Sequence, residues 1–426
     1  MLPVNTQRNC SERIDEIEES SYVNKKKNIQ YKIGVSYVSV ENARENLKAE
    51  NTGWDFLQIQ NQAESKWNHY LGKIEVEGTN PDRTTQFYTH LYRSFIHPNV
   101  CSDVNGEYMG ADFRVHKSRS KHYTSFSNWD TYRTQIQLLS ILDPEVASDI
   151  VISHQLFAEE AGGAFPRWVM ANIETGVMQG DPTPILISNA YAFGARNYDP
   201  KPIFKTMRKG AEEPGAMSQE VEARPGLKQY LDKGYYNASI QLEYTSADFA
   251  IAQFALHAVG DEFASWRYFH FARSWKNLYN PETGWLQSRN PDGSWKPLTE
   301  DFRESTYKNY FWMVPYDIAG LIEIIGGKAA AEKRLDEFFT RLDAGYNDAW
   351  FASGNEPSFH IPWIYNWVGT PYKAQEIINR VLNEQYSSKI DGLPGNDDLG
   401  TMGAWYVFAC IGLYPEIPGV GGFTVN

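Results

Sequence analysis

The chain has 426 residues, with 53 acidic and 40 basic side chains and a net charge of −13. This length suits one large domain, or one domain plus a fragment, and the acidic balance argues against nucleic-acid partners, which bind clustered Lys and Arg. No apolar run reaches the roughly 18 residues that a membrane span needs, and three widely spaced cysteines fit neither a disulfide framework nor a zinc site. The 13 tryptophans therefore stand out, and they predict a large core, a lined pocket or both.

The first forty residues predict a disordered lead-in followed by a single strand. Residues 1–31 are polar and rich in Lys and Glu, and their first 21 residues contain no apolar stretch of the kind that a secretory signal requires. The segment YKIGVSYVSV, at 31–40, alternates and is rich in β-branched and aromatic residues, which predicts a strand. A single strand cannot bury its own faces. Either it docks on the main domain, or its sheet partners lie outside this chain.

The rest of the chain predicts helices. Apolar side chains recur at helical spacing in 41–75, which indicates two helices, and from residue 76 onward helices are separated by long loops that carry aromatic residues. The clearest helix is TSADFAIAQFALHAVGD, where Thr245 and Asp248 form a predicted capping box and Gly260 closes the helix. The last helix, DLGTMGAWYVFACIGLYP, is apolar nearly all round, which predicts full burial.

This combination of helices and loops predicts the fold class. Helices of roughly 12–18 residues joined by loops of roughly 15–25 residues are unusual for a bundle, whose connections are short. Long loops on a helical frame are where function is expected. The pattern therefore favours a mainly α fold in the form of a toroid of helix pairs, an (α/α) barrel whose loops gather at one end.

Two loops combine aromatic residues with groups that bind hydroxyls. In SFSNWDTYR, Trp129 and Asp130 stand just before a helix; the alternative is that Asp130 caps that helix and Trp129 belongs to the core. In the loop at 162–182, Arg167 beside Trp168 could hold a hydroxyl-rich ligand; alternatively this segment is no more than a helix connection.

Two further regions are rich in carboxylates and amides. Glu304 lies among aromatic residues in LTEDFRESTYKNYFW, and such surroundings desolvate a carboxyl group and suit a general acid; the alternative is a surface Glu at a helix start. The loops GNEPSFHIPWIYNW and GNDDLG bring oxygen ligands of the kind that Ca²⁺ takes, although tight Asn/Asp/Gly turns would also explain them. The residues concerned are Asn355, Glu356, His360, Asn396 and Asp398.

Together these loops favour a carbohydrate site. Sugars stack their C–H faces on aromatic rings and present hydroxyls to forked polar groups. Hydrolysis of a glycosidic bond needs two carboxyl groups, one acting as acid and the other as base or nucleophile. The sequence offers both on separate loops.

These residues resemble the calcium-dependent exo-α-mannosidases of glycoside hydrolase family 92. The resemblance follows the family's order over roughly residues 32–415, and its most specific segments are GNDDLGTMGAWYVF and the NEPS loop. Other segments that carry it are VSYVSVENARENLKAE, FYTHLYRSFIHPN, DVNGEYMGAD, FSNWDTYR, FPRW, MQGDP, YNPETGWLQ with DGSW, and WMVPYD.

The resemblance implies an (α/α)6 barrel preceded by a β-sandwich, with a helical linker between them. It also implies removal of terminal α-linked mannose from glycans, with inversion and with the help of Ca²⁺. Only the strand at 31–40 represents the sandwich here, and the chain stops at GVGGFTVN, before the family's usual end. We therefore expect a lead-in and remnant strand at 1–40, a helical linker at 41–75, and a catalytic barrel at 76–426 whose C-terminal end is incomplete.

The resemblance also implies roles for individual residues. Glu304 matches the general acid and Asp398 the general base. The residues expected to contact substrate are Trp129, Asp130, Arg167, Trp168, Asn355, Glu356 and His360, and those expected to contact Ca²⁺ are Asn355, Glu356 and Asn396.

The sequence also allows other functions. In this family the sandwich contributes part of the pocket, so the chain could bind mannose or glycans as an inactive remnant, or could require the missing sandwich domain as a partner. A glucoamylase-like hydrolase or a lyase on the same frame is disfavoured by the joint presence of WDTYR, NEPS and GNDDLG. Expected partners are mannose-containing glycans or mannosides, with neither nucleic acid nor membrane, and the family suggests a secreted or periplasmic location.

Overall fold

The computed structural model describes residues 30–426, so the predicted disordered lead-in lies almost wholly outside the described residues. The strand predicted at 31–40 is wrong: residues 30–39 form no ladder with any described segment, and a helix begins at Val40. Local alternation is present, since Tyr31, Ile33 and Val35 are exposed, but a strand requires a hydrogen-bonded neighbour. The segment is held instead by side chains, because Asn46 Nδ2 donates to the Val35 carbonyl at 2.8 Å.

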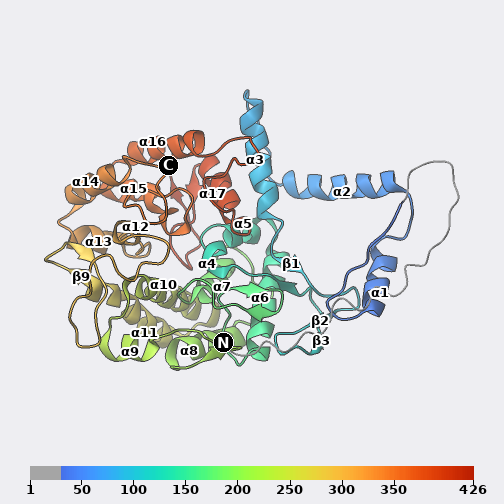
Figure 1. Cartoon of the computed structure of the whole chain (residues 1–426), viewed down its shortest axis with the longest axis horizontal. Coiled ribbons are helices and arrows are strands. Elements are labelled where there is room, and N and C mark those ends of the chain that lie inside the picture. Colours follow the sequence, from blue (N-terminus) through green and yellow to red (C-terminus); the bar gives the residue numbers. More distant parts are fainter. Residues whose placement is uncertain (1–29) are drawn as a thin grey trace.

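The two helices predicted within 41–75 are present. Helix α1 (Val40–Glu50) begins with the Ser39 side chain as its cap, and α2 (Phe56–Leu71) begins with that of Asp55. Both lie to the right of the helical body in Figure 1, and α2 contains no buried residue. The assignment of 41–75 as a linker between domains stays a prediction.

Within the described residues, the body of the molecule alternates between two kinds of helix along the chain. The amphipathic helices bury one face; they are α3 (Pro81–Ser94), α6 (Pro144–Glu160), α8 (Pro200–Glu212), α11 (Glu262–Ala272), α14 (Lys328–Phe338) and α16 (Pro371–Glu384). The others have at least half of their residues buried; they are α5 (Gln135–Leu142), α7 (Pro182–Ala192), α10 (Ala238–Phe254), α12 (Tyr307–Tyr310), α15 (Ile364–Val368) and α17 (Thr401–Cys410). The first set therefore forms an outer layer and the second an inner layer, as six successive outer–inner pairs.

Contacts between successive inner helices close the ring. Along the inner layer, α7 packs against both α5 and α10, and the last inner helix, α17, returns to pack against α5 and α3 at the start of the body. Residues Thr401–Ala409 of α17 are all buried, as the sequence predicts. The fold is therefore mainly α, with an (α/α)6 barrel as its body.

Short elements occupy the connections. The remaining helices are α4 (Asn128–Thr131), α9 (Leu227–Lys233), α13 (Ile318–Ile324) and the turns η1 (Ala255–Val259), η2 (Arg273–Leu278), η3 (Glu356–Ser358) and η4 (Ile361–Trp363). The strands pair antiparallel in twos: β1 (Asn99–Val100) with β4 (Tyr123–Thr124), β2 (Glu107–Met109) with β3 (Val115–Lys117), β5 (Val169–Met170) with β6 (Ile173–Glu174), β7 (Met217–Ser218) with β8 (Val221–Glu222), β9 (Tyr279–Asn280) with β10 (Trp285–Leu286), and β11 (Leu413–Tyr414) with β12 (Thr424–Val425). Among the described residues, no helix is both long and apolar enough to cross a membrane.

Helix α10 corrects one prediction. It begins at Ala238, so Thr245 and Asp248 lie inside the helix and form no capping box. Thr245 Oγ1 bonds to the Leu242 carbonyl one turn back, and Asp248 pairs with a buried arginine. Polar residues early in α10 hid its start in the sequence. The predicted end is correct, since Gly260 follows η1 with φ +80°, a left-handed conformation that suits glycine.

Candidate active site

Three carboxylates from distant loops meet in the barrel. Asp130 lies in α4, Glu356 opens η3, and Asp398 lies just before α17. One oxygen from each lies within 4.8 Å of the others. The structure thus brings together three of the five loops that the sequence singles out.

The three carboxylates, called here the acidic trio, carry no matching positive charge. Asp130 is 1% exposed and Glu356 is 2% exposed, and within residues 30–426 no lysine or arginine forms a salt bridge with any member. Asp130 accepts a hydrogen bond from Ser127 Oγ, but Asp130 Oδ1 and Glu356 Oε1 are buried without a partner among the described residues. Burying charge without compensation costs several kcal/mol, on the order that stabilises a whole domain. The trio therefore needs either bound protons or a cation.

The acidities of the trio reflect this crowding. Burial raises the pKa of Asp130 well above its usual range, and the negative charge of Asp398 raises it further. Burial also raises the pKa of Glu356, with Asp130 and Asp398 as additional causes. For Asp398, burial again comes first among the causes of a raised pKa. The charge of Asp398 thus makes both Asp130 and Glu356 harder to ionise, and a bound cation would relieve this repulsion.

Glu304 lies in the same electrostatic field, since its charge is among the causes that raise the pKa of both Asp130 and Asp398. Its side chain is partly exposed, and its carbonyl accepts a hydrogen bond of 2.5 Å from Asn355 Nδ2. Glu304 and Asp398 have φ values of +48° and +44°, a left-handed conformation that costs a residue with a side chain about 1–3 kcal/mol. Such strain concentrates at functional sites.

The other predicted substrate residues differ in how much of their side chain is available to a ligand. Trp168 is half-buried, but Trp129 has no exposed surface. Arg167 is buried, with Nε donating to the Gly180 carbonyl at 3.1 Å and Nη2 donating to the carbonyls of Glu222 and Ala223. Arg167 therefore ties loops together, and only Nη1 is left for a ligand.

His360 and Asn396 also lie in contrasting settings. His360 Nε2 lies 2.7 Å from the Trp312 carbonyl, so this nitrogen carries the proton, and burial lowers the pKa of His360 to about 4. The ring is thus neutral at neutral pH. Asn396, predicted as a metal ligand, is exposed two residues before Asp398.

The donor set fits a hard cation. Ca²⁺ takes oxygen ligands, mostly carboxylates and carbonyls, and the trio offers carboxylate oxygens, two of which lack a partner within residues 30–426. Of the predicted metal ligands, Glu356 belongs to the trio and Asn355 is its neighbour in the chain. Asp130 and Asp398 enter the group only because the fold brings their loops together.

Three functional candidates escaped sequence analysis. Glu243 in α10 and Arg133 form a buried ion pair of 3.0 Å directly behind Asp130. Tyr346 is 43% exposed, and after burial the causes of its raised pKa are the charges of the trio and of Glu304. Arg133 lies in the FSNWDTYR segment, but no local pattern gives any of the three a role. The one signal for Glu243 was an acidic residue, with Asp248, in the segment ASIQLEYTSADF, which carries no other charge.

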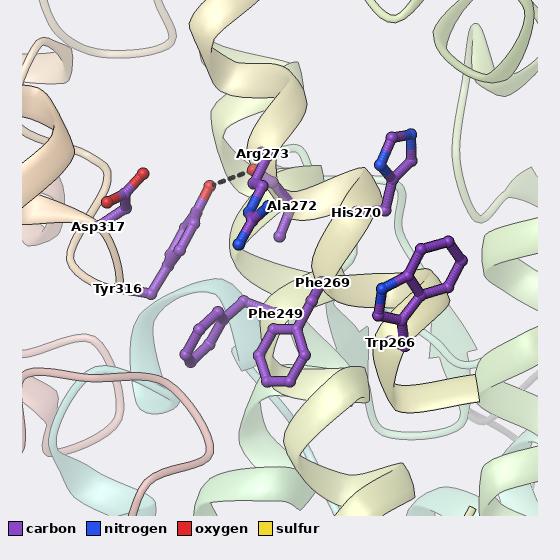
Figure 2. Close-up of a pocket in the computed structure, with 8 residues that line it drawn as sticks. All are labelled: Phe249, Trp266, Phe269, His270, Ala272, Arg273, Tyr316 and Asp317. Atoms are coloured by element: carbon purple, nitrogen blue, oxygen red, sulfur yellow. Dashed lines mark hydrogen bonds between the residues drawn. The ribbon is translucent and has the colours of Figure 1, made fainter. Parts of the chain in front are cut away.

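Two other features of the surface resemble sites but lie outside the acidic trio. A hollow of about 460 Å³ lies between α11 and the segment that leads into α13. Figure 2 shows the side chains that line it. Two of its polar side chains bond within the protein: the Tyr316 hydroxyl donates to the Ala272 carbonyl, and Asp317 accepts from Gly320 N and Trp275 Nε1. The hollow contains none of the residues of the acidic trio.

The second feature is a cluster of Asp112, His116 and Glu160. Asp112 Oδ1 lies 2.9 Å from His116 Nε2, and Glu160 accepts from the Tyr108 hydroxyl at 2.6 Å and from Ala111 N at 2.9 Å. These partners leave the cluster no unpaired oxygen of the kind found in the trio.

A ring of helix pairs with carboxylates gathered in its loops defines the class, an (α/α)6 barrel with an acidic cluster in its loops. Residues 42–426 match the glycosyl hydrolase family 92 catalytic domain. The chain belongs to glycosyl hydrolase family 92.

Relatives of this chain are about twice as long. The family GH92 α-mannosidase BT3965 from Bacteroides thetaiotaomicron is 30% identical with a TM-score of 0.83, over 90% of this chain and 52% of that one. The GH92 inverting mannosidase BT2199 from the same organism is 28% identical with a TM-score of 0.82, over 92% and 57%. An uncharacterized secreted glycosidase of Arthroderma benhamiae is 26% identical over 440 residues, 91% of this chain and 51% of that protein. The chain thus spans about half the length of these relatives.

Proposed function

We propose that this chain is an exo-α-mannosidase that removes terminal α-linked mannose from glycans with inversion and with the help of Ca²⁺. The observation that carries the proposal is the acidic trio, whose buried oxygens lack partners among the described residues, beside Glu304. Support also comes from the relatives, which include family 92 α-mannosidases, one of them bound to mannoimidazole and another described as inverting.

In the proposed mechanism, Glu304 donates its proton to the glycosidic oxygen as the bond to the anomeric carbon breaks. Asp398 removes a proton from a water on the opposite face of the sugar, and the water oxygen forms the new bond. The left-handed backbone at both residues fixes the direction of their side chains. Asp130 and Arg167, through its free Nη1, would bind hydroxyls of the terminal mannose.

The calcium ion would be held by Glu356 with Asn355 and Asn396, and Asp130 is a further candidate ligand. When bound, it would supply positive charge beside the sugar hydroxyls and relieve the repulsion within the trio. The residues present fit such an ion because their donor atoms are oxygens, and two of these are unpaired in the part of the chain that the structure describes.

Binding of mannose without hydrolysis is the second candidate function. It is favoured by the share of the relatives that this chain covers, because half of their length could contribute walls of the pocket. A secreted or periplasmic location is likewise a proposal, supported by the relative that is described as secreted.

The test is a panel of α-linked mannobioses, with a β-linked mannobiose as the negative substrate, incubated with the chain in Ca²⁺. The proposal expects mannose release from at least one α-linked member and from no β-linked one. A folded chain that binds mannose but releases none from any member would favour the second candidate. Glu300→Gln, at an exposed position four residues before Glu304, is the matched control for Glu304→Gln.

A further inference from the structure

Glu243 lies in inner helix α10 and is 1% exposed, yet both of its carboxylate oxygens are used. Oε1 accepts from Trp129 Nε1 at 3.1 Å and from Arg133 Nη2 at 3.0 Å. Oε2 accepts from the Tyr132 hydroxyl at 3.0 Å. One carboxylate therefore receives hydrogen bonds from three residues of the WDTYR segment, which surround Asp130.

Arg133 also holds the WDTYR segment in place, through contacts with Trp129 and Tyr132. Its guanidinium carbon lies 4.7 Å from the ring centre of Trp129 and 4.5 Å from that of Tyr132. Arg133 Nε also donates to the Trp129 carbonyl at 3.1 Å. Cation–ring contacts and charge-assisted hydrogen bonds are strong where water is excluded. The backbone on both sides of Asp130 is thus fixed by residues that Glu243 holds.

Asp130 itself has little to hold it. Its only side-chain hydrogen bond within the described residues is the one from Ser127, and its Oδ1 is unpaired. The direction of its carboxylate therefore depends on the backbone of α4, which the contacts to Glu243 fix. Glu243 acts on Asp130 through Trp129, Tyr132 and Arg133.

Glu243 also meets the second predicted sugar loop. A Cβ atom at Gly180, in the MQGDP segment, would lie 2.5 Å from the Cβ of Glu243, so only glycine fits there. The Gly180 carbonyl in turn accepts the hydrogen bond from Arg167 Nε. Both loops that are predicted to hold the terminal sugar therefore pack on this one side chain.

We propose that Glu243 is a positioning residue for the sugar site: it sets the place of Asp130 and, through Gly180, of the loop that carries Arg167. It is not a catalytic residue, because its oxygens are occupied by Trp129, Tyr132 and Arg133 and cannot reach substrate. The inference rests on the proposed function.

The test compares two tyrosine-to-phenylalanine changes of the same chemistry. Tyr132→Phe removes one hydrogen bond to Glu243. Tyr268→Phe, the matched control, removes a hydrogen bond of 2.7 Å from a buried tyrosine to Glu212, away from the acidic trio. Both variants lose one tyrosine–carboxylate bond and should show similar small shifts in melting temperature.

For an α-mannobiose that the wild-type chain cleaves, Tyr132→Phe should lower kcat/KM by roughly 3–10-fold, while Tyr268→Phe should leave it unchanged. Glu243→Gln, which keeps the shape but removes the charge, should lower it by about 100-fold, as expected when a binding group is displaced by about 1 Å. Glu243→Asp, which keeps the charge, should retain more activity than Glu243→Gln at an equal loss of melting temperature.

The outcomes separate the two proposals. If the wild-type chain cleaves no mannobiose, the proposed function fails and the positioning role fails with it. If the wild type is active and Tyr132→Phe and Tyr268→Phe lower kcat/KM equally, Glu243 is structural only and the positioning role alone is overturned. If Glu243→Gln does not fold, the Tyr132→Phe and Tyr268→Phe pair still decides.

Discussion

Two buried acidic clusters in this barrel solve the same electrostatic problem in different ways. Asp181 and Asp248 share the guanidinium of Arg224, which lies 2.7 Å from each, and the Tyr230 hydroxyl donates to Asp248 at 2.7 Å. In the acidic trio, Asp130 and Glu356 are as deeply buried and Asp398 is half-buried, but the trio has no such cation among the described residues.

The difference indicates which cluster serves the fold and which serves a ligand. A buried carboxylate is tolerated when an ion pair and hydrogen bonds compensate it, as around Arg224. A buried acidic cluster that the chain leaves uncompensated lowers the free energy of unfolding unless a ligand binds to it. The Arg224 cluster is therefore structural, and the trio is where the proposed cation and substrate would bind.

The largest effect is expected at the proposed acid and base. Glu304→Gln and Asp398→Asn should each reduce kcat on an α-mannobiose by about 10²–10⁴-fold, since each removes a proton-transfer group. Steady-state kinetics with matched circular dichroism spectra would check this. Glu300→Gln should keep wild-type activity, and a loss of similar size in that control would remove the assignment of Glu304.

A substitution in the Arg224 cluster should change the stability of the fold. Asp248→Asn breaks a buried ion pair that has excellent geometry, so the free energy of unfolding should fall by about 3–5 kcal/mol. Urea denaturation with and without Ca²⁺ would measure it. The loss should be the same in both conditions, and a loss seen only with Ca²⁺ would mean that this cluster binds the ion.

Glu416 is an intermediate case, because it is buried with only neutral donors, Trp367 Nε1 and Thr424 Oγ1. Burial raises the pKa of Glu416 to about 7. Because the folded-state pKa is raised, its contribution to stability is full below the unfolded pKa near 4.5 and is lost as the pH rises through about 7.

Glu416→Gln should therefore stabilise the chain more at pH 8 than at pH 4.5, by roughly 3 kcal/mol. Thermal or urea unfolding of both proteins across this pH range would test it. An equal effect of the substitution at both pH values would show that Glu416 titrates normally.

The smallest expected effect is a change in stability whose sign distinguishes the trio from the Arg224 cluster. Without Ca²⁺, Glu356→Gln removes one of three repelling buried carboxylates and should raise the free energy of unfolding by about 1 kcal/mol. This sign is opposite to that of Asp248→Asn. With saturating Ca²⁺ the wild type should gain stability by ligand binding and the variant should gain less. Destabilisation by Glu356→Gln in EDTA would contradict an uncompensated trio.

The sequence predicted much of the fold because the two helical layers differ in composition. Outer helices such as α16 are amphipathic, whereas α17 is apolar all round, and this contrast is visible without coordinates. The strand at 31–40 was wrong because local alternation cannot reveal whether a partner strand exists. The start of α10 was missed because its buried Gln241 and Glu243 look like surface residues until their partners are known.

The site, like the fold, was predictable only as far as local sequence patterns reach. Motifs located Asp130, Glu356 and Asp398, but their approach to within 4.8 Å depends on ring closure between segments more than 200 residues apart. Trp129 was expected to contact substrate, yet the structure buries it behind Asp130, where it bonds to Glu243 at a separation of 114 residues. A non-local partner of this kind leaves no trace in local spacing.

The central claim, that the acidic trio with Glu304 forms a calcium-assisted mannosidase site, is tested most directly by proton NMR of α-mannobiose hydrolysis. The chain would be followed from the first minutes, once with Ca²⁺ and once with EDTA. The account predicts that β-mannose appears first in Ca²⁺ and that EDTA suppresses its formation. α-Mannose as the first product would contradict inversion, and equal rates in EDTA would contradict the role of calcium. The absence of any mannose from a folded chain in Ca²⁺ would contradict the claim as a whole.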